Sequence, residues 1–275
     1  MSTGIRRGRK YVTATMAYGV ELAATPRLRM FAGPNGSGKS TIKAAIVNVI
    51  GPELLGVYIN PDEIESDIRC SNFLDLAAYG VETTAAEVLG FFMRSSFLAK
   101  VGLTDEAAKL CFDDGKLNFA AVSVNSYFAS VSADFIRHKL LEAGVTFTFE
   151  TVMSSPDKID FLKKAQEHGF RTYLYYVATE DPDINISRVE SRVAEGGHPV
   201  PRDKIVERYH RSLDLLADAV QYANRAYIFD NSSDKKVWVA EVTEGDSLEL
   251  KSDNMPYWFK AALWDKFASE GESAG

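Results

Sequence analysis

The sequence is poor in cysteine, since Cys70 and Cys111 are the only two in 275 residues. Two cysteines exclude a disulfide framework and a cysteine-based metal cluster, and they suit a reducing compartment in which we expect both thiols to be buried. Long apolar runs are also missing, because no segment approaches the ~20 uncharged apolar residues that cross a bilayer. We therefore expect a cytoplasmic protein that has no membrane partner.

Excess positive charge is absent as well. The chain has 31 lysines and arginines against 38 aspartates and glutamates, which is a formal net charge of −7 at pH 7. This balance argues against a nucleic-acid partner that is bound by charge. The first ten residues are basic, but no apolar signal-peptide core follows them, so we interpret them as a solvated tail. The expected partners are small molecules or proteins.

What the sequence does contain is a phosphate-binding loop motif. Residues 33–41 read Gly-Pro-Asn-Gly-Ser-Gly-Lys-Ser-Thr and fit G-x-x-x-x-G-K-[ST] at every fixed position. The glycines allow φ > 0, so that backbone N–H groups turn inward around a polyphosphate at the start of the next helix. An apolar run at 28–32 and a helical pattern at 41–47 flank the motif, which disfavours an ordinary glycine-rich turn.

The motif predicts a role for each of its positions. The Lys39 ammonium is expected to reach the β- and γ-phosphates and to act in catalysis, and the Ser40 hydroxyl is expected to bind Mg²⁺. We predict that nucleotide phosphates bind the loop residues Gly33, Pro34, Asn35, Gly36, Ser37, Gly38, Lys39, Ser40 and Thr41.

Strand and helix patterns alternate along the rest of the chain. Short strands are predicted at 28–32, 56–60, 144–150, 171–178 and 226–229, with helices between them. This order predicts an α/β protein of the P-loop NTPase class. Its parallel sheet of about five strands should be covered by helices on both faces.

We divide the chain into three parts. Residues 1–26 form a lead-in, 27–232 the phosphate-loop domain, and 233–275 an extension with a hairpin and a helix. Inside the domain, about 63–143 is predicted to be a helical insertion, with helices at 83–100 and 127–143 and a polar, irregular stretch at 104–119. Two basic helices at about 181–212 are predicted to form a lid.

Two carboxylates end strands close to the loop. Asp62 follows the strand 56–60, where α/β sheets bind ligands, and it could accept a proton from an acceptor hydroxyl or hold Mg²⁺. It could instead cap the next helix, because Asn-Pro-Asp-Glu also resembles a helix start. Glu150 ends the strand 144–150. Spacing alone does not decide whether its carboxylate faces the same ligand crevice as Asp62 or lies at the surface.

Arginines gather on the two helices of the predicted lid. Arg188 and Arg192 share a helix face, where like charges repel unless an anion lies between them. Arg208 and Arg211 belong to a second basic stripe. Such arginines suit a lid that stabilises a transferring phosphoryl group, and pairing with nearby glutamates at the surface is the alternative. His198, in the connection between the helices, either contacts the nucleotide or caps a turn.

Four segments together resemble the zeta-toxin-like P-loop kinases, particularly the bacterial branch described as predicted ABC-type ATPases. They are residues 31–41, 59–62, 149–151 and 192–201, and the resemblance covers about 27–232. It implies ATP and Mg²⁺ as cofactors and phosphorylation of a small molecule, which in the best-known toxins is the amino sugar of UDP-N-acetylglucosamine. It also raises the hypothesis of a toxin with an antitoxin protein as its partner.

The same resemblance implies roles for individual residues. Lys39 would bind phosphate and Asp62 would act as the base on the acceptor hydroxyl. Glu150 and Thr151 would contact the acceptor. The lid residues that would contact ATP are Arg188, Arg192, Arg208 and Arg211, of which Arg192 would act in catalysis.

The chain departs from the family pattern on the acceptor side. Glu65 stands where the toxins carry arginine in Asp-x-Phe-Arg, and Val152 stands where they carry threonine in Glu-Gly-Thr-Leu-Arg, unless Thr151 substitutes. The resemblance therefore implies the kinase reaction more firmly than it implies the identity of the acceptor. An ABC-type ATPase would need L-S-G-G-Q and a GTP switch would need N-K-x-D, and neither is present. A P-loop ATPase or a nucleotide-binding regulator without an acceptor stays the alternative.

Overall fold

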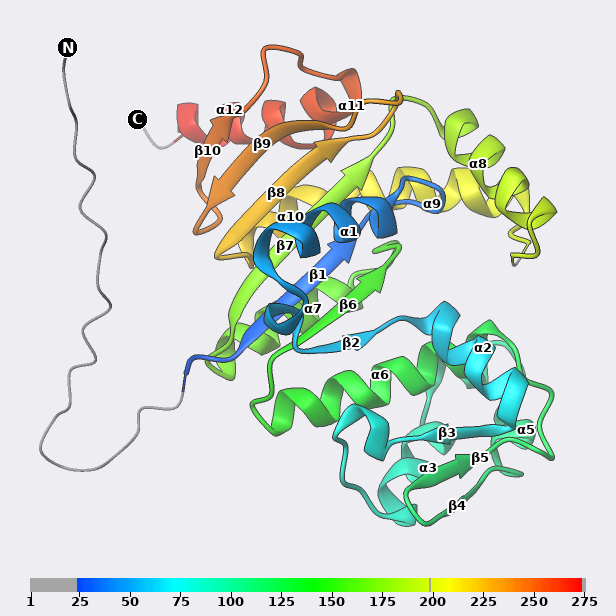
Figure 1. Cartoon of the computed structure of the whole chain (residues 1–275). Coiled ribbons are helices and arrows are strands. Elements are labelled where there is room, and N and C mark those ends of the chain that lie inside the picture. The colour runs from blue at the N-terminus through cyan, green and yellow to red at the C-terminus, as the bar shows by residue number, and fades with distance from the viewer. Residues whose placement is uncertain (1–23, 198, 274–275) are drawn as a thin grey trace, which may run out of the picture.

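The computed structural model describes residues 24–197 and 199–273, and the structural statements below concern these residues. A seven-stranded sheet crosses the molecule in the order β10-β9-β8-β7-β1-β6-β2 (Figure 1). The strands β2, β6, β1, β7 and β8 are parallel, which confirms the predicted α/β class and its parallel sheet of five strands. The bounds are β1 (Arg27–Ala32), β2 (Val57–Ile59), β6 (Phe147–Thr151), β7 (Arg171–Ala178), β8 (Arg225–Asp230), β9 (Val237–Thr243) and β10 (Ser247–Leu250).

The C-terminal hairpin extends this sheet from five strands to seven. β9 pairs antiparallel with β8, and β10 pairs antiparallel with β9. The chain then continues through α11 (Tyr257–Phe259), a π-helical turn η3 (Lys260–Trp264) and α12 (Asp265–Ser273). The buried side chains of Trp258 and Leu263 join the main hydrophobic core, so this segment is packed as part of the domain.

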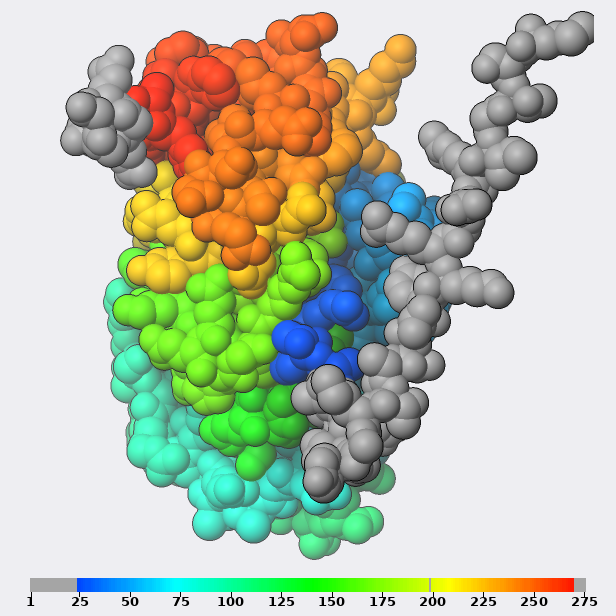
Figure 2. All heavy atoms as spheres, turned by 90° about the vertical axis from the view of Figure 1, so that its left-hand side faces the viewer, coloured from blue at the N-terminus to red at the C-terminus, as the bar shows by residue number. Residues whose placement is uncertain are grey.

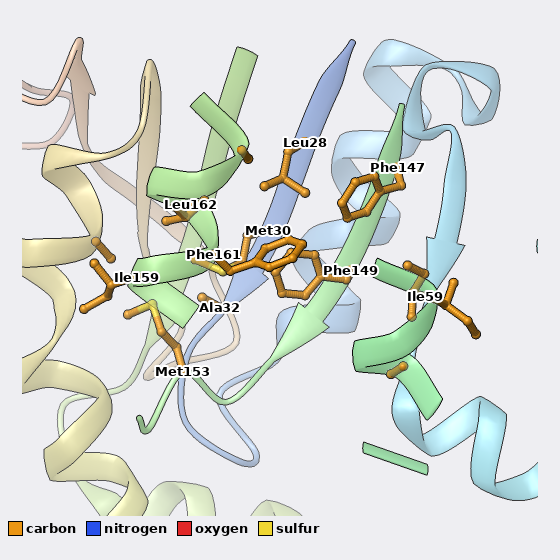
Figure 3. Close-up of a cluster of buried hydrophobic side chains, with 14 of the residues drawn as sticks. Leu28, Met30, Ala32, Ile59, Phe147, Phe149, Met153, Ile159, Phe161 and Leu162 are labelled. Atoms are coloured by element: carbon orange, nitrogen blue, oxygen red, sulfur yellow. The ribbon is translucent and has the colours of Figure 1, made fainter. Parts of the chain in front are cut away.

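Helices cover both faces of the sheet, because successive side chains of a strand point to opposite faces. On one face, Ile42 of α1 packs against Phe31 and Tyr175. On the other face, α6, α7 and α10 cover the larger core, in which the Phe161 and Phe149 rings lie 5.8 Å apart (Figure 3). The bounds are α1 (Lys39–Ile50), η1 (Pro52–Leu55), α6 (Ser126–Glu142), α7 (Asp157–Glu167) and α10 (Leu216–Gln221).

The insertion and the C-terminal segments lie at opposite ends of the molecule (Figure 1, Figure 2). The helix predicted at 83–100 is two helices, because Ser95 caps α4 by accepting a hydrogen bond from the backbone N–H of Leu98 (3.2 Å). The elements before α6 are α2 (Pro61–Ser71), β3 (Phe73–Asp75), η2 (Ala77–Tyr79), α3 (Ala85–Met93), α4 (Ser96–Lys100), α5 (Thr104–Ala107), β4 (Cys111–Asp113) and β5 (Lys116–Asn118).

A second, antiparallel sheet of order β3-β5-β4 lies inside the insertion, where the sequence predicted helices and an irregular stretch. Its strands have three residues each, which is too short for an alternating pattern to be recognised. The signal that could have found it is Asp114-Gly115. These residues have φ of 46° and 73°, and Asp-Gly favours a two-residue hairpin loop with two positive φ angles.

Both cysteines are exposed, so the expectation of buried thiols is wrong. Cys70 lies two positions after the buried Ile68 of α2, and residues at that spacing do not share a helix face. Cys111 lies on the short strand β4 at the surface of the insertion. Within the described ranges, no helix is long and apolar enough to cross a membrane.

Candidate nucleotide-binding and phosphoryl-transfer site

The phosphate loop connects the end of β1 to α1, in the strand–loop–helix setting that the motif requires. Gly33, Gly36 and Gly38 have φ of 139°, 72° and 93°, a region that side chains with a Cβ rarely adopt. A Cβ would also clash with a neighbouring atom at all three, and at Gly36 it would lie 2.5 Å from the carbonyl oxygen of Asn185. A Cβ on Gly33 would lie 2.0 Å from the carbonyl oxygen of Val177, and one on Gly38 would lie 2.1 Å from Nδ2 of Asn231. The loop therefore needs glycine for both conformation and packing.

Lys39 lies folded against its own loop. Its Nζ donates hydrogen bonds to the carbonyl oxygens of Gly33 and Pro34, both at 2.9 Å. Burial lowers the pKa of Lys39 to about 8, although the charges of Glu150 and Asp62 partly oppose that shift. A bound phosphate would give this ammonium an anionic partner in place of two neutral carbonyls.

Glu150 lies beside the loop, and both of its carboxylate oxygens are engaged. Oε2 accepts a hydrogen bond from the Ser40 hydroxyl (3.1 Å), and Oε1 accepts one from the Tyr58 hydroxyl (2.6 Å). Oε1 also lies 3.3 Å from Nζ of Lys43, whose ammonium sits 3.6 Å from the centroid of the Tyr58 ring. The predicted contact of Glu150 with an acceptor stays a prediction.

The pair of Ser40 and Glu150 fits a magnesium ion. Mg²⁺ prefers hard oxygen ligands, and it is commonly held by a hydroxyl or carboxylate together with phosphate oxygens. A carboxylate that accepts a hydrogen bond from the hydroxyl ligand can orient that ligand. The described residues contain no group of three or more histidine, cysteine or acidic side chains that could hold a metal ion.

Asp62 does not cap the helix that it opens. The cap of α2 is Asn60, whose Oδ1 accepts a hydrogen bond from the backbone N–H of Asp62 (3.0 Å). The Asp62 carboxylate is therefore free of that structural role, and it is 72% exposed. Its Oδ2 lies 3.8 Å from Nη1 of Arg192 on α8 (Pro182–Ala194). Two of the three predicted catalytic residues, Asp62 and Arg192, thus face each other from different helices.

One face of α8 is directed at the phosphate loop. Asn185, Arg188 and Arg192 are spaced i, i+3 and i+7, so they lie along the same face. Nδ2 of Asn185 donates a hydrogen bond to the carbonyl oxygen of Asn35 in the loop (2.5 Å). Nη1 of Arg188 is buried and has no hydrogen-bond partner among the described residues. Because a buried N–H without an acceptor is costly, this guanidinium is suited to an anion.

The second helix of the predicted lid, α9 (Arg202–Asp214), is fixed to the domain. The Tyr209 hydroxyl donates to the carbonyl oxygen of Thr179 (2.6 Å), and the Ser212 hydroxyl donates to that of Val152 (2.9 Å). Arg211 is half-exposed and pairs with Glu207 at 3.4 Å.

The structure thus places Arg188 on the face of α8 whose Asn185 contacts the loop, Arg192 beside Asp62, and Arg211 at the surface. Arg208 is half-buried, between the buried Ile205 and Ser212 of α9. His198 lies outside the described residues.

The loop after β6 has an unusual backbone. Met153 is buried and has φ of 53°, a left-handed conformation that is uncommon for residues other than glycine. The Thr151 hydroxyl stabilises it by accepting a hydrogen bond from the backbone N–H of Met153 (3.1 Å). This hydrogen bond and the one from Ser212 to Val152 fix the conformation of the segment 151–153, which begins with a residue predicted to contact the acceptor.

Two residues that support the phosphate loop were not predicted from the sequence. Nδ2 of Asn231, directly after β8, donates a hydrogen bond to the carbonyl oxygen of Ser37 (2.8 Å), and Asn185 supports Asn35 as described above. Asn231 follows the carboxyl end of a parallel strand, where ligand sites form in α/β sheets. The position of Asn231 after a strand could therefore have indicated a contact with the loop. The sequence around Asn185 contains no comparable indication.

Comparison with known proteins gives one family match and one curated relative. The family model described as Zeta toxin matches residues 118–243. An uncharacterized protein of Haemophilus influenzae is 32% identical over 72 residues, which is 26% of this chain and 51% of that protein. The chain therefore spans about half the length of this relative.

Solved structures show the same fold at low sequence identity. The native crystal structure of the AvrRxo1-ORF1:-ORF2 complex aligns with a TM-score of 0.51 and 17% identity, over 87% of this chain and 64% of that chain. The structure of that complex with ATP aligns with a TM-score of 0.50 and 17% identity, over 89% and 64%. The chain covers less than two thirds of these neighbours. The matched segment, the fold and the phosphate loop make this chain similar to the zeta-toxin-like P-loop kinases, and the family match covers less than half of the chain.

Proposed function

We propose that this protein is an ATP-dependent kinase that transfers the γ-phosphoryl group of ATP to a hydroxyl of a small molecule. The observation that carries the proposal is the position of Asp62. Its carboxylate is not used as a helix cap, and it faces Arg192 at 3.8 Å. Both charges also act on Lys39, whose pKa the Asp62 carboxylate raises and the Arg192 guanidinium lowers. A carboxylate and two cations therefore interact with one another beside the phosphate loop.

The residues of this site would have separate roles in phosphoryl transfer. The loop N–H groups and Lys39 would hold the phosphates, and Arg188 and Arg192 would neutralise charge on the transferring group. Asp62 would take the proton of the acceptor hydroxyl as its oxygen bonds to the γ-phosphorus and the bond to the β-phosphate oxygen breaks, releasing ADP. Ser40 and Glu150 would hold Mg²⁺, which supplies charge neutralisation of the phosphates when it is bound.

The finer parts of this proposal come from the family. They are a UDP-sugar such as UDP-N-acetylglucosamine, or a related nucleotide-like molecule, as the acceptor, an antitoxin protein as partner, and a cytoplasmic location. The binding of ATP by the AvrRxo1-ORF1:-ORF2 complex supports ATP as the donor. The acceptor must be sought broadly, because Glu65 replaces a family arginine, is buried, and pairs with Arg69 at 2.7 Å.

A mass-spectrometric assay tests the kinase function. The purified protein is incubated with Mg²⁺-ATP and a panel of UDP-sugars, nucleosides and small metabolites, and products with an added phosphoryl group are sought. We expect one acceptor to be phosphorylated by the wild type and by neither Lys39→Ala nor Asp62→Asn. ADP without any phosphorylated acceptor would instead favour an ATPase, and an Asp62→Asn variant with unchanged behaviour would favour a regulator without turnover.

Growth tests the toxin part separately. If the protein is a toxin, its overexpression should slow growth and Lys39→Ala should relieve that effect. Normal growth at high wild-type levels would count against toxicity while leaving the kinase assay as the test of the activity.

A further inference from the structure

The C-terminal segment makes a buried hydrogen bond to the strand that ends at the phosphate loop. Nε1 of Trp258, on α11, donates to Oδ2 of Asp230 at the end of β8 (2.7 Å). Both side chains are almost fully buried, with 3% and 5% exposed. Hydrogen bonds to a buried carboxylate are among the stronger ones in proteins. Trp258 lies beyond residue 243, where the family match ends.

Asp230 in turn sets the position of its neighbour, Asn231. The Asn231 side chain donates to the carbonyl oxygen of Ser37 in the phosphate loop (2.8 Å), and its backbone N–H donates to Ala178 (2.9 Å). Contact here is so tight that a Cβ on Gly38 would overlap Nδ2 of Asn231. A small displacement of the Asp230–Asn231 turn would therefore move the loop.

A second set of bonds leads from the same segment to α8. The backbone N–H of Tyr257 donates to Oε1 of Glu180 (3.0 Å), and the backbone N–H of Glu180 donates to the Ser232 hydroxyl (2.8 Å). That hydroxyl donates to Oδ2 of Asp230 (2.7 Å). Glu180 lies just before α8, the helix whose Asn185 supports the loop. Both asparagines that bind the loop are therefore tied to the C-terminal segment.

We propose, on the basis of the kinase function proposed above, that Trp258 is a positioning residue for ATP binding. It acts through Asp230 and Asn231, which hold the carbonyl of Ser37 and thereby the direction of the loop N–H groups. Without the indole donor, the hydrogen bonds that the described residues would still give the buried Asp230 carboxylate are those from Ser232. An under-satisfied buried carboxylate rearranges or admits water, and Asn231 would move with it.

Calorimetric titration of ATP, in the presence of Mg²⁺, into the full-length protein tests this role. Trp258→Phe keeps an aromatic ring and removes the donor, and Trp238→Phe is the matched control. The indole of Trp238 donates to the carbonyl oxygen of Ala240 (3.0 Å) on β9, and its ring lies against Tyr227 and Lys251. We expect the Kd for ATP to rise about tenfold in Trp258→Phe and to stay unchanged in Trp238→Phe.

The outcomes distinguish a failure of the proposed kinase function from a failure of the positioning role of Trp258. If the wild type binds no ATP, the proposed kinase function fails. If it binds and Trp258→Phe has the same Kd, the positioning role is wrong while the kinase function stands, even if the variant melts at a lower temperature. Should Trp258→Phe not fold, Asp230→Ala is the second variant. It removes the acceptor of the indole and leaves the Asn231 side chain in place, so an unchanged Kd for ATP in that variant would equally refute the role.

Discussion

The Ser40 hydroxyl donates a hydrogen bond to Oε2 of Glu150 at 3.1 Å, across 110 positions of sequence. The register of the sheet brings these residues together. β6 lies parallel to β1 with Glu150 opposite Phe31, and the phosphate loop begins two residues after Phe31. A carboxylate at that register position lies next to the first turn of α1, where Ser40 sits.

Glu150→Gln should raise the Mg²⁺ concentration that ATP binding requires. Glutamine can still accept a hydrogen bond from Ser40, but it removes the negative charge beside the hydroxyl. Changes to residues that orient a metal ligand commonly cost about 10–100-fold in metal affinity, so we expect the Mg²⁺ concentration for half-maximal ATP binding to rise at least about tenfold. Calorimetry at a series of Mg²⁺ concentrations measures this without any acceptor.

Tyr58→Phe is the control for that substitution. It removes one hydrogen bond to Glu150 and leaves the carboxylate charge in place, so the Mg²⁺ requirement should change much less. If Glu150→Gln leaves the Mg²⁺ requirement unaltered and raises only the KM for the acceptor, then the contact with the acceptor predicted from the sequence is the correct role.

The affinity for ATP should fall as the pH rises above 8. Burial lowers the pKa of Lys39 to about 8 in the ligand-free protein, whereas bound phosphates favour the ammonium form. Below pH 8 the lysine is charged both before and after binding, so affinity is constant. Above pH 8 the free protein must take up a proton in order to bind, and affinity should fall by up to about tenfold per pH unit.

Calorimetry in two buffers of different ionisation enthalpy measures both the Kd and the proton uptake. Lys39→Arg is the control, because arginine stays protonated throughout this range. That variant should bind ATP less well than the wild type at pH 7 and show no loss between about pH 8 and 9.5. A wild-type Kd that is flat over the same range would contradict the lowered pKa.

The features that could be predicted from the sequence are those that depend on neighbouring residues. The loop motif sets its own conformation through glycines at fixed spacing, and each strand of the parallel sheet is a short apolar run. Asp62 and Glu150 were found for the same reason, since each ends such a run. The choice between Asp62 as a cap and as a free carboxylate needed the structure, because Asn60 competes for the same N–H groups.

The features that were missed depend on residues far apart in the sequence. Asn231 and Asn185 support the loop only because β7 and β8 bring their ends beside β1. The Lys43 and Tyr58 contacts with Glu150 likewise join three separate elements. Asp114-Gly115 was different, since its hairpin signal was local and was outweighed by the polar character of the stretch around it.

Gly38→Ala should abolish tight ATP binding as well as lower stability. Its φ is 93°, and the new Cβ would lie 2.1 Å from Nδ2 of Asn231. Gly115→Ala is a matched control, because its φ of 73° carries similar backbone strain but no heavy atom lies within 4 Å of the new Cβ. Positive φ costs about 1–2 kcal/mol in either variant.

Only Gly38→Ala should weaken ATP binding, by about 100-fold or more, because only there must the loop move. Thermal unfolding and ATP titration of both variants measure the two effects separately. Equal ATP affinities in Gly38→Ala and the wild type would show that Asn231 gives way to the new methyl group instead.

Arg188→Ala should lose function without losing stability. Nη1 of Arg188 is buried with no hydrogen-bond partner among the described residues, so truncating the side chain removes an unsatisfied group from the free protein. Its melting temperature should be equal to that of the wild type or slightly higher. Removing an arginine that neutralises a transferring phosphoryl group should lower the rate of phosphorylation about 100-fold.

Arg211→Ala should show the reverse pattern, which makes it the control for Arg188→Ala. Arg211 pairs with Glu207 one turn away at the surface of α9, and such pairs stabilise helices by roughly 0.3–0.5 kcal/mol. Its loss should lower the melting temperature slightly and leave the rate unchanged. Thermal unfolding and the acceptor assay, applied to both variants, separate the two arginines. A rate that falls equally in both would mean that α9 acts on the phosphates as well as the loop-facing side of α8.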